Sequence, residues 1–209
     1  MKFLEENGFN IFIVGRWNPS IFSPQWIRAN LVSGNDEVML AIPFGNPLAP
    51  PRMSFAGIQL FTANDFLELK PDSLDSDNIK SCADVASKIL SLLCHTPITA
   101  IGVNVRFEEQ APCSTLDKIF SFSDQALIDQ KAYPTTSSTV ARSFSLGQQD
   151  SLNLSITQNS TNYVVEFNFH TESQDKGVVI SKADESYVTG RISKAKQFML
   201  SAYSLTIDE

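Results

Sequence analysis

Strict alternation of apolar and polar side chains is the strongest pattern in the chain. In residues 98–108 the apolar members of this alternation are Ile101, Val103, Val105 and Phe107. Successive side chains of a β-strand point to opposite faces of its sheet, so a period of two predicts a strand with one buried face. The same period recurs three times within 139–171, with turn-forming residues between the repeats, which predicts an antiparallel three-strand meander.

Other segments show weaker strand patterns or a helical period. Four short segments are rich in β-branched and aromatic residues and are predicted as strands: 9–15, 37–43, 54–62 and 65–70. Residues 77–94 carry one apolar stripe and are predicted as a helix. A second helix is predicted from Ser114, because Asp117 three residues later resembles a capping arrangement. A third amphipathic helix is predicted to begin near Ser181 or Asp184.

The order of these elements predicts an α+β fold with a mostly antiparallel sheet in two strand-rich halves. Three amphipathic helices are expected to pack on one face of the sheet, the long one at the C-terminal end. A doubly wound parallel sheet would instead alternate strands and helices regularly. No linker or charge block divides the 209 residues, so we expect a single domain over 1–209. The two halves suggest a duplication, without a residue-level repeat, and the proline-rich segment 43–53 is predicted as a loop.

Composition limits the classes of partner. The net charge of −7 and the isoelectric point near 4.8 argue against nucleic acid and anionic membranes as partners. No apolar run approaches the roughly 18 residues that cross a bilayer, and the first ten residues, MKFLEENGFN, place two glutamates where a signal peptide would be apolar. These features predict a cytoplasmic protein of a bacterium or phage, without a membrane span.

Residue types that perform catalysis or bind metals are scarce. The three cysteines form no CxxC pair and only His95 and His170 accompany them, so we expect no disulfide framework, no metal and no cofactor. Common nucleotide-binding and hydrolase motifs such as GxSxG and HExxH are absent. The best dispersed set is Cys113 with His170 and Glu166, because an imidazole could generate the nucleophilic thiolate. An enzyme using this set is kept as the alternative function.

Residues 16–28, RWNPSIFSPQWIR, concentrate both tryptophans between two arginines. Tryptophan and arginine are favoured at the centres of protein interfaces. We therefore predict a partner-binding surface made of Arg16, Trp17, Phe22, Trp26 and Arg28. One alternative is that Trp17 and Trp26 fold back to cover the core under a loop. Another is that the rings stack on bases of a nucleic acid.

Charged clusters near helix ends have simple structural explanations. The carboxylates of Asp72, Asp75 and Asp77 precede a predicted helix and are expected to cap it. Four basic residues of the last helical region are predicted to form a solvated face: Lys182, Arg191, Lys194 and Lys196. Taken together, the sequence favours a non-catalytic binding or assembly subunit of a bacterial or phage multicomponent system. Its partner is expected to be another protein or a second copy of the chain.

Overall fold

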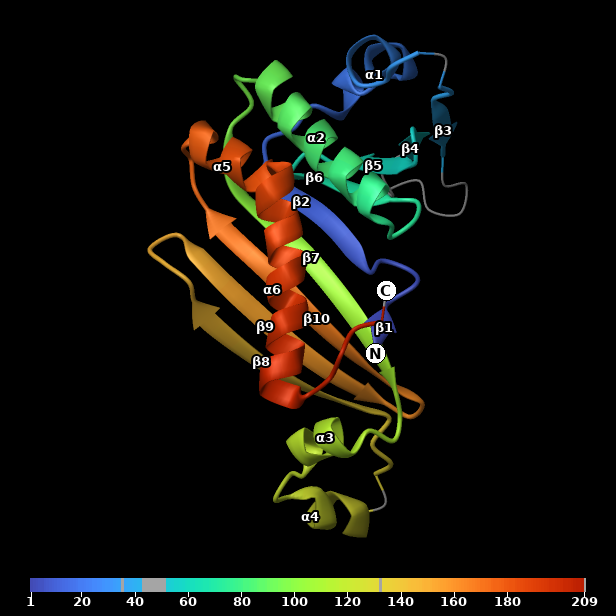
Figure 1. The fold of residues 1–209 in the computed structure, drawn as a ribbon, viewed down its shortest axis with the longest axis vertical. Coiled ribbons are helices and arrows are strands. Elements are labelled where there is room, and N and C mark those ends of the chain that lie inside the picture. The colour runs from blue at the N-terminus through green and yellow to red at the C-terminus, as the bar shows by residue number, and fades with distance from the viewer. Residues whose placement is uncertain (35, 43–51, 132, 209) are drawn as a thin grey trace.

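A computed structural model describes residues 1–34, 36–42, 52–131 and 133–208. In these residues ten strands form one antiparallel sheet, and the long C-terminal helix lies across it (Figure 1). The predicted α+β class with a mostly antiparallel sheet is confirmed. Most of the predicted loop 43–53 lies outside the described residues.

The elements follow one another along the chain as two rounds of strands and helices. The strands are β1 (Lys2–Phe3), β2 (Phe9–Gly15), β3 (Met39–Ala41), β4 (Arg52–Phe55), β5 (Ile58–Thr62), β6 (Phe66–Pro71), β7 (Ile98–Gln110), β8 (Ser137–Ser145), β9 (Asp150–Asn159) and β10 (Asn162–Glu172). The helices are α1 (Pro24–Asn30), α2 (Ser76–Leu92), α3 (Ser114–Asp117), α4 (Gln125–Gln130), α5 (Lys176–Ala183) and α6 (Glu185–Tyr203). Across the sheet the order is β3-β4-β5-β6-β2-β7-β10-β9-β8, with β1 beside β7.

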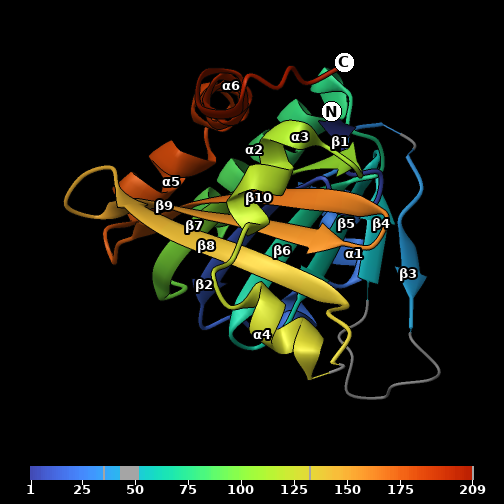
Figure 2. The same cartoon turned by 90° about the horizontal axis from the view of Figure 1, so that it is seen from below.

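The core lies between the sheet and the layer of α2, α5 and α6 (Figure 2). The apolar residues of the strands point to this layer, as the period of two predicts. Val105 of the central strand is fully buried and pairs with Phe9 on one side and Phe167 on the other. Burial of such side chains is the main stabilising contribution to a fold of this size.

Capping groups fix where the long helices begin. The side chain of Asp75 accepts a hydrogen bond from the backbone N–H of Asn78 at 2.8 Å, so the predicted capping role of Asp75 is confirmed. Asp184 caps α6 in the same way through the N–H of Ser186. The ammonium of Lys176 on α5 donates to the carbonyl of Leu93 at 2.7 Å and so ties α5 to the end of α2. These bonds fix the starts of α2 and α6 and the position of α5 against the end of α2.

The two halves of the chain share one topology. Each runs from a strand through a helical segment and an antiparallel meander to a helix, and the first strand of each half lies at the centre of the sheet. In the first half β6 returns to pair with β2, and in the second half β10 returns to pair with β7. The two halves therefore resemble one another in topology, although in the described residues the first meander has four strands, β3 to β6, and the second has three, β8 to β10.

Two predicted elements differ in the structure. The single strand predicted over 54–62 is wrong: β4 and β5 form a hairpin, because Ala56 and Gly57 adopt positive φ angles of 47° and 73° and turn the chain back. The helix predicted from Ser114 does begin there, but it is not one continuous α-helix, because a 3-10 turn over Lys118–Phe120 follows α3. There α3 lasts one turn with Cys113 at its N-cap position, and Asp117 binds the hydroxyl of Tyr163 instead of capping the helix.

A row of polar residues crosses the sheet face that α2, α5 and α6 leave uncovered. From β2 to β8 its members, one per strand, are Asn10, Asn104, Asn168, Asn153 and Ser143. Amide hydrogen bonds join Asn153 to Asn168 at 3.1 Å and Asn168 to Asn104 at 2.6 Å. A slip of one residue would break these bonds, so the row helps to fix the register of β9 and β10 against β7.

Candidate functional site

Residues 16–28 close one end of the molecule with a cluster of aromatic rings. The indole N–H of Trp17 donates to the carbonyl of Ile13 at 3.1 Å, and Trp17 is only 5% exposed. The ring of Phe22, also buried, lies 6.2 Å from that of Trp17 and 5.3 Å from that of Trp26. The structure therefore places Trp17 and Phe22 in the core, where they support the surface above them.

Local contacts hold α1 in a fixed position over this cluster. The hydroxyl of Ser23 caps α1 by accepting from the N–H of Trp26 at 3.2 Å, and Pro24 occupies the first turn, where its missing N–H costs nothing. Ile27 is fully buried and anchors the helix. Trp26 is half-buried, whereas Arg16 and Arg28 are exposed. Of the five predicted site residues, these last three retain solvent-accessible surface.

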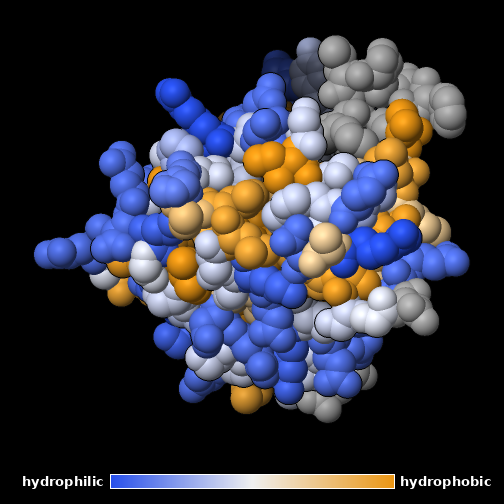
Figure 3. Space-filling view, turned by 90° about the horizontal axis from the view of Figure 1, so that it is seen from above, coloured by the Kyte–Doolittle hydropathy of each residue, from blue (hydrophilic) through white to orange (hydrophobic). Residues whose placement is uncertain are grey.

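The exposed surface around α1 extends to the end of α2. The backbone N–H of Arg16 donates to the carbonyl of Pro97 at 2.9 Å, which brings this segment beside the chain that leaves α2. Leu92, in the last turn of α2, is 45% exposed. We name the α1 face as the surface of Arg16, Ile21, Trp26, Arg28 and Leu92. Figure 3 shows this end of the molecule, with apolar side chains gathered in its middle and hydrophilic ones around them.

The chain after α1 adds further exposed apolar side chains at the edge of the sheet. Met39 in β3 is 62% exposed, and Leu40 and Ile42 are exposed as well. Edge strands with apolar side chains readily pair or pack with other chains. The sequence analysis missed this feature, although the segment EVMLAIP carries four large or branched apolar residues with one glutamate.

The dispersed catalytic candidates do not come together. His170 pairs with Gly102, whereas Cys113 follows Gln110, which pairs with Asn162 at the other end of β10. Eight residues of strand separate the two ends, a distance of about 26 Å. Glu166 lies between them and binds Arg106 at 2.6 Å. Cys113 therefore has neither His170 nor Glu166 as a base.

Metal-binding and nucleophilic groups are equally dispersed in the described residues. Within residues 1–34, 36–42, 52–131 and 133–208, no three histidine, cysteine or acidic side chains gather as metal ligands. Burial, assisted by the charge of Asp72, raises the pKa of the Cys82 thiol far above its usual range. Cys82 therefore stays protonated and unreactive.

The opposite end of the molecule has a polar hollow that the sequence analysis did not find. It has a volume of about 530 Å³ and is lined mainly by hydroxyl and amide side chains around Tyr163. The Tyr163 hydroxyl donates to Asp117 and accepts from Gln158 at 2.8 Å. Burial, and then the bond to the Asp117 carboxylate, raise the pKa of Tyr163, so the hydroxyl stays neutral. The hollow offers hydrogen bonds to a ligand but no activated nucleophile.

The predicted solvated basic face of the last helical region is only partly solvated. Lys194 is exposed, but Lys182 forms an ion pair with Asp150 at 2.6 Å, and Arg191 is buried. The prediction is wrong for these two residues, because Lys182 on α5 pairs with Asp150 of β9 and Arg191 on α6 is turned toward the rings of Phe169 and Tyr187. The alternation of charged and apolar residues in 182–196 does not distinguish these two orientations.

No protein-family model matches the chain, and no curated protein matches it significantly in sequence. Among the described residues, no helix combines the length and apolar character that a membrane crossing requires.

Proposed function

We propose that this chain is a non-catalytic protein-binding or assembly subunit of a bacterial or phage system, and that it docks its partner on the α1 face. The observation that carries the proposal is the half-buried Trp26 at the end of the molecule that also exposes Leu92, Arg16 and Arg28. An aromatic anchor beside apolar area, with charges at the rim, is the typical composition of an interface centre.

The charge around the α1 face favours a partner with acidic residues at the rim of its own surface. Arg16 and Arg28 are positive on a chain whose net charge is −7, so they orient an acidic partner without attracting phosphate backbones in general. We infer a protein partner and a cytoplasmic location on this basis.

The rigidity of α1 favours tight binding. Ser23 caps the helix, Ile27 anchors it, and the amide of Asn30 donates to the carbonyl of Trp26 at 2.9 Å. Side chains that are already held in place lose little conformational entropy when a partner docks. The buried rings of Trp17 and Phe22 contribute by supporting Trp26, without touching the partner.

Site-specific photo-cross-linking tests the proposal. A photoreactive amino acid replaces Gln25, which is exposed on α1, or Ser123, which is exposed near the opposite end of the molecule, and each protein is irradiated in an extract of its native host. We expect one defined adduct from position 25 that disappears when Arg28→Glu is added, and no such adduct from position 123. No adduct from position 25, equal adducts from both positions, or an adduct containing only a second copy of this chain would contradict docking of a separate partner on the α1 face.

A further inference from the structure

A small pocket lies between α6 and the outer strands of the second half. Its volume is about 270 Å³, just below the range of roughly 300–1,000 Å³ that drug-sized ligands occupy. Four of its lining residues are apolar and two are basic: Leu146, Leu152, Phe169, Phe198, Arg191 and Lys194. We name it the Arg191 pocket. Its size suits a small ligand or a single side chain.

Arg191 is a buried cation with no anion beside it. It is 8% exposed, and among the described residues its Nε has no hydrogen-bond partner and its guanidinium forms no ion pair. The guanidinium carbon lies 4.2 Å from the ring centre of Tyr187 and 5.3 Å from that of Phe169. Contact with rings offsets only part of the cost of burying a charge. An anion placed beside the guanidinium would offset the remaining cost.

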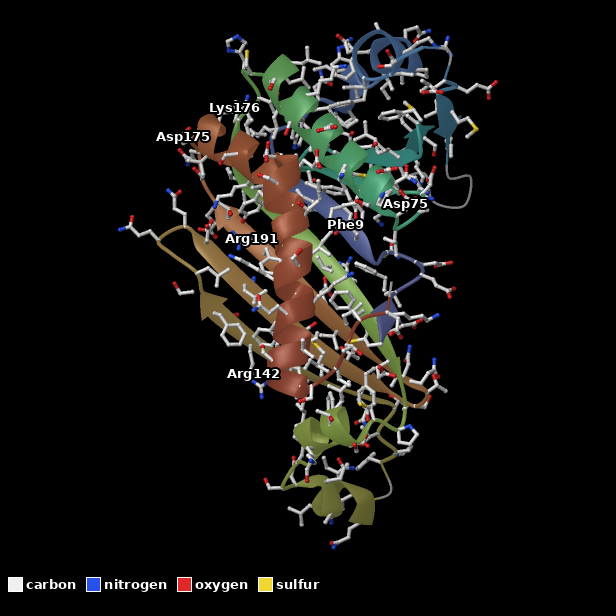
Figure 4. All side chains as sticks on the ribbon, in the orientation of Figure 1. Phe9, Asp75, Arg142, Asp175, Lys176 and Arg191 are labelled. Carbon is white, nitrogen blue, oxygen red and sulfur yellow. The ribbon has the colours of Figure 1, made fainter. Side chains whose placement is uncertain are left out.

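The acidic residue whose charge interacts with Arg191 at longer range is Asp150, and its carboxylate already has hydrogen-bond donors. Asp150 accepts hydrogen bonds from Lys182 at 2.6 Å and from the Thr171 hydroxyl at 2.6 Å. Lys194, one turn after Arg191 on α6, is exposed and lines the same pocket. Figure 4 shows Arg191 extending from α6 over the strands of the second half, on the same side of the helix as Arg142. The pocket therefore has a deep cation and a second cation at its mouth.

We propose that the Arg191 pocket binds a small monocarboxylate that carries an apolar group. The planar guanidinium matches the two oxygens of a carboxylate and forms short, charge-assisted hydrogen bonds with them. The apolar group of the ligand would lie against Leu152, Phe169 and Phe198. A phosphate dianion fits these apolar walls less well, because it would lose hydration there without gaining polar contacts. The ligand is either a free organic acid or the C-terminal carboxylate of a peptide with an apolar last residue.

An NMR titration of the full chain tests this proposal. The probes are hexanoate, the neutral isostere hexanamide, N-acetyl-leucine, N-acetyl-leucinamide and inorganic phosphate. We expect the two carboxylates to shift the backbone amides of α6 around residue 191 in a saturable manner, and the two amides and phosphate to leave them unchanged. Tighter binding of hexanoate indicates a free acid as the ligand, and tighter binding of N-acetyl-leucine indicates a peptide terminus.

Matched variants separate ligand binding from a structural role. Arg191→Met should weaken binding of the preferred carboxylate more than about tenfold, because hydrogen bonds to charged groups contribute more free energy than hydrogen bonds between neutral groups. Its melting temperature should stay the same or rise, because an apolar side chain replaces an unpaired buried charge. Arg142→Met, which removes an arginine that donates to the Tyr203 hydroxyl at 3.1 Å, should keep the affinity. Equal shifts from hexanoate and hexanamide, saturable binding of phosphate alone, or unchanged affinity in Arg191→Met would overturn the proposal.

Discussion

The two halves of the sheet have similar topologies, but the ends of the two halves are packed differently. Trp17 and Phe22 fill the end of the first half, and the surface above them is a solid face with exposed side chains. In the second half the corresponding helical segment leaves a hollow of about 530 Å³ beside Tyr163. The same arrangement of strands therefore supports a filled end in the first half and a hollow in the second. Large aromatic side chains directly after the first strand account for the difference.

The sheet edges differ in the same way. The first half ends in β3, three residues long, with exposed apolar side chains beyond its pairing with β4. The second half ends in β8, nine residues long, which carries mostly serine and threonine and one charge, Arg142. A long edge strand can pair with the edge of another chain and cause aggregation. The polar side chains and the charge of Arg142 on β8 limit such pairing at this edge. The two halves therefore end in edges of different composition, apolar in the first half and polar in the second.

The largest expected effect comes from breaking the seam between the halves. Val105→Asp places an unpaired carboxylate on the central strand between Phe9 and Phe167, and we expect it to lower the free energy of unfolding by more than about 4 kcal/mol. Chemical denaturation measures the loss. The control Thr99→Asp, on the same strand but exposed, should cost less than about 0.5 kcal/mol. Similar costs for the two variants would contradict the assignment of the core.

The two ends should differ in how much a ring contributes to stability. Trp17→Ala removes a buried indole and is expected to lower the free energy of unfolding by about 3–5 kcal/mol. Tyr163→Phe keeps the ring but leaves Asp117 without its hydroxyl partner, and should cost about 1–2 kcal/mol. Urea unfolding curves of both variants provide the comparison. A smaller loss of stability for Trp17→Ala than for Tyr163→Phe would contradict the tight packing of the end that Trp17 fills.

Acid should loosen the attachment between the second half and its helices. Burial alone would raise the pKa of the Asp150 carboxyl. The hydrogen bonds from Lys182 and Thr171 lower it by more than burial raises it, so the pKa of Asp150 in the folded protein lies below the usual value. An unfolded aspartate titrates near pH 4. The stabilisation that Asp150 contributes is therefore complete above about pH 4. It is lost as the pH falls through the pKa of Asp150 in the folded protein, because Asp150 is protonated at a higher pH in the unfolded chain than in the folded one. Melting temperatures from pH 7 to 2 should fall less steeply for Asp150→Asn than for the wild type, and parallel curves would contradict this.

Patterns of side-chain period predict the fold well because they report burial directly. Residues 98–108, the meander in 139–171 and the helix over 77–94 all appear with the expected bounds to within a few residues. The hairpin within 54–62 was missed because its turn is only two residues long, and one of them is Ala56, which rarely adopts a positive φ. The role of Asp117 was missed because its partner, the hydroxyl of Tyr163, lies 46 positions away in the sequence.

The candidate site is harder to predict because burial decides which aromatic residues a partner can reach. The sequence groups Trp17, Phe22 and Trp26 together, and only the structure separates two core rings from one half-buried ring. For Arg191 the sequence predicts an exposed side chain, and the structure shows a buried one. A basic residue on a helix is normally solvated, and its burial depends on how α6 crosses strands that are distant in the sequence.

The measurement that tests the central claim most directly pairs stability with binding in one double variant of the α1 face. Trp26→Ala with Arg28→Ala should lower the free energy of unfolding by less than about 1 kcal/mol, because Trp26 is only half-buried and Arg28 is exposed. The same pair should weaken the cross-linked partner's affinity by about thirtyfold or more, as truncation of interface anchors does. Unfolding followed by tryptophan fluorescence and a titration with the purified partner give both values. A protein that loses several kcal/mol of stability, yet still binds the partner with wild-type affinity in its folded fraction, would contradict the claim that the α1 face is the docking surface.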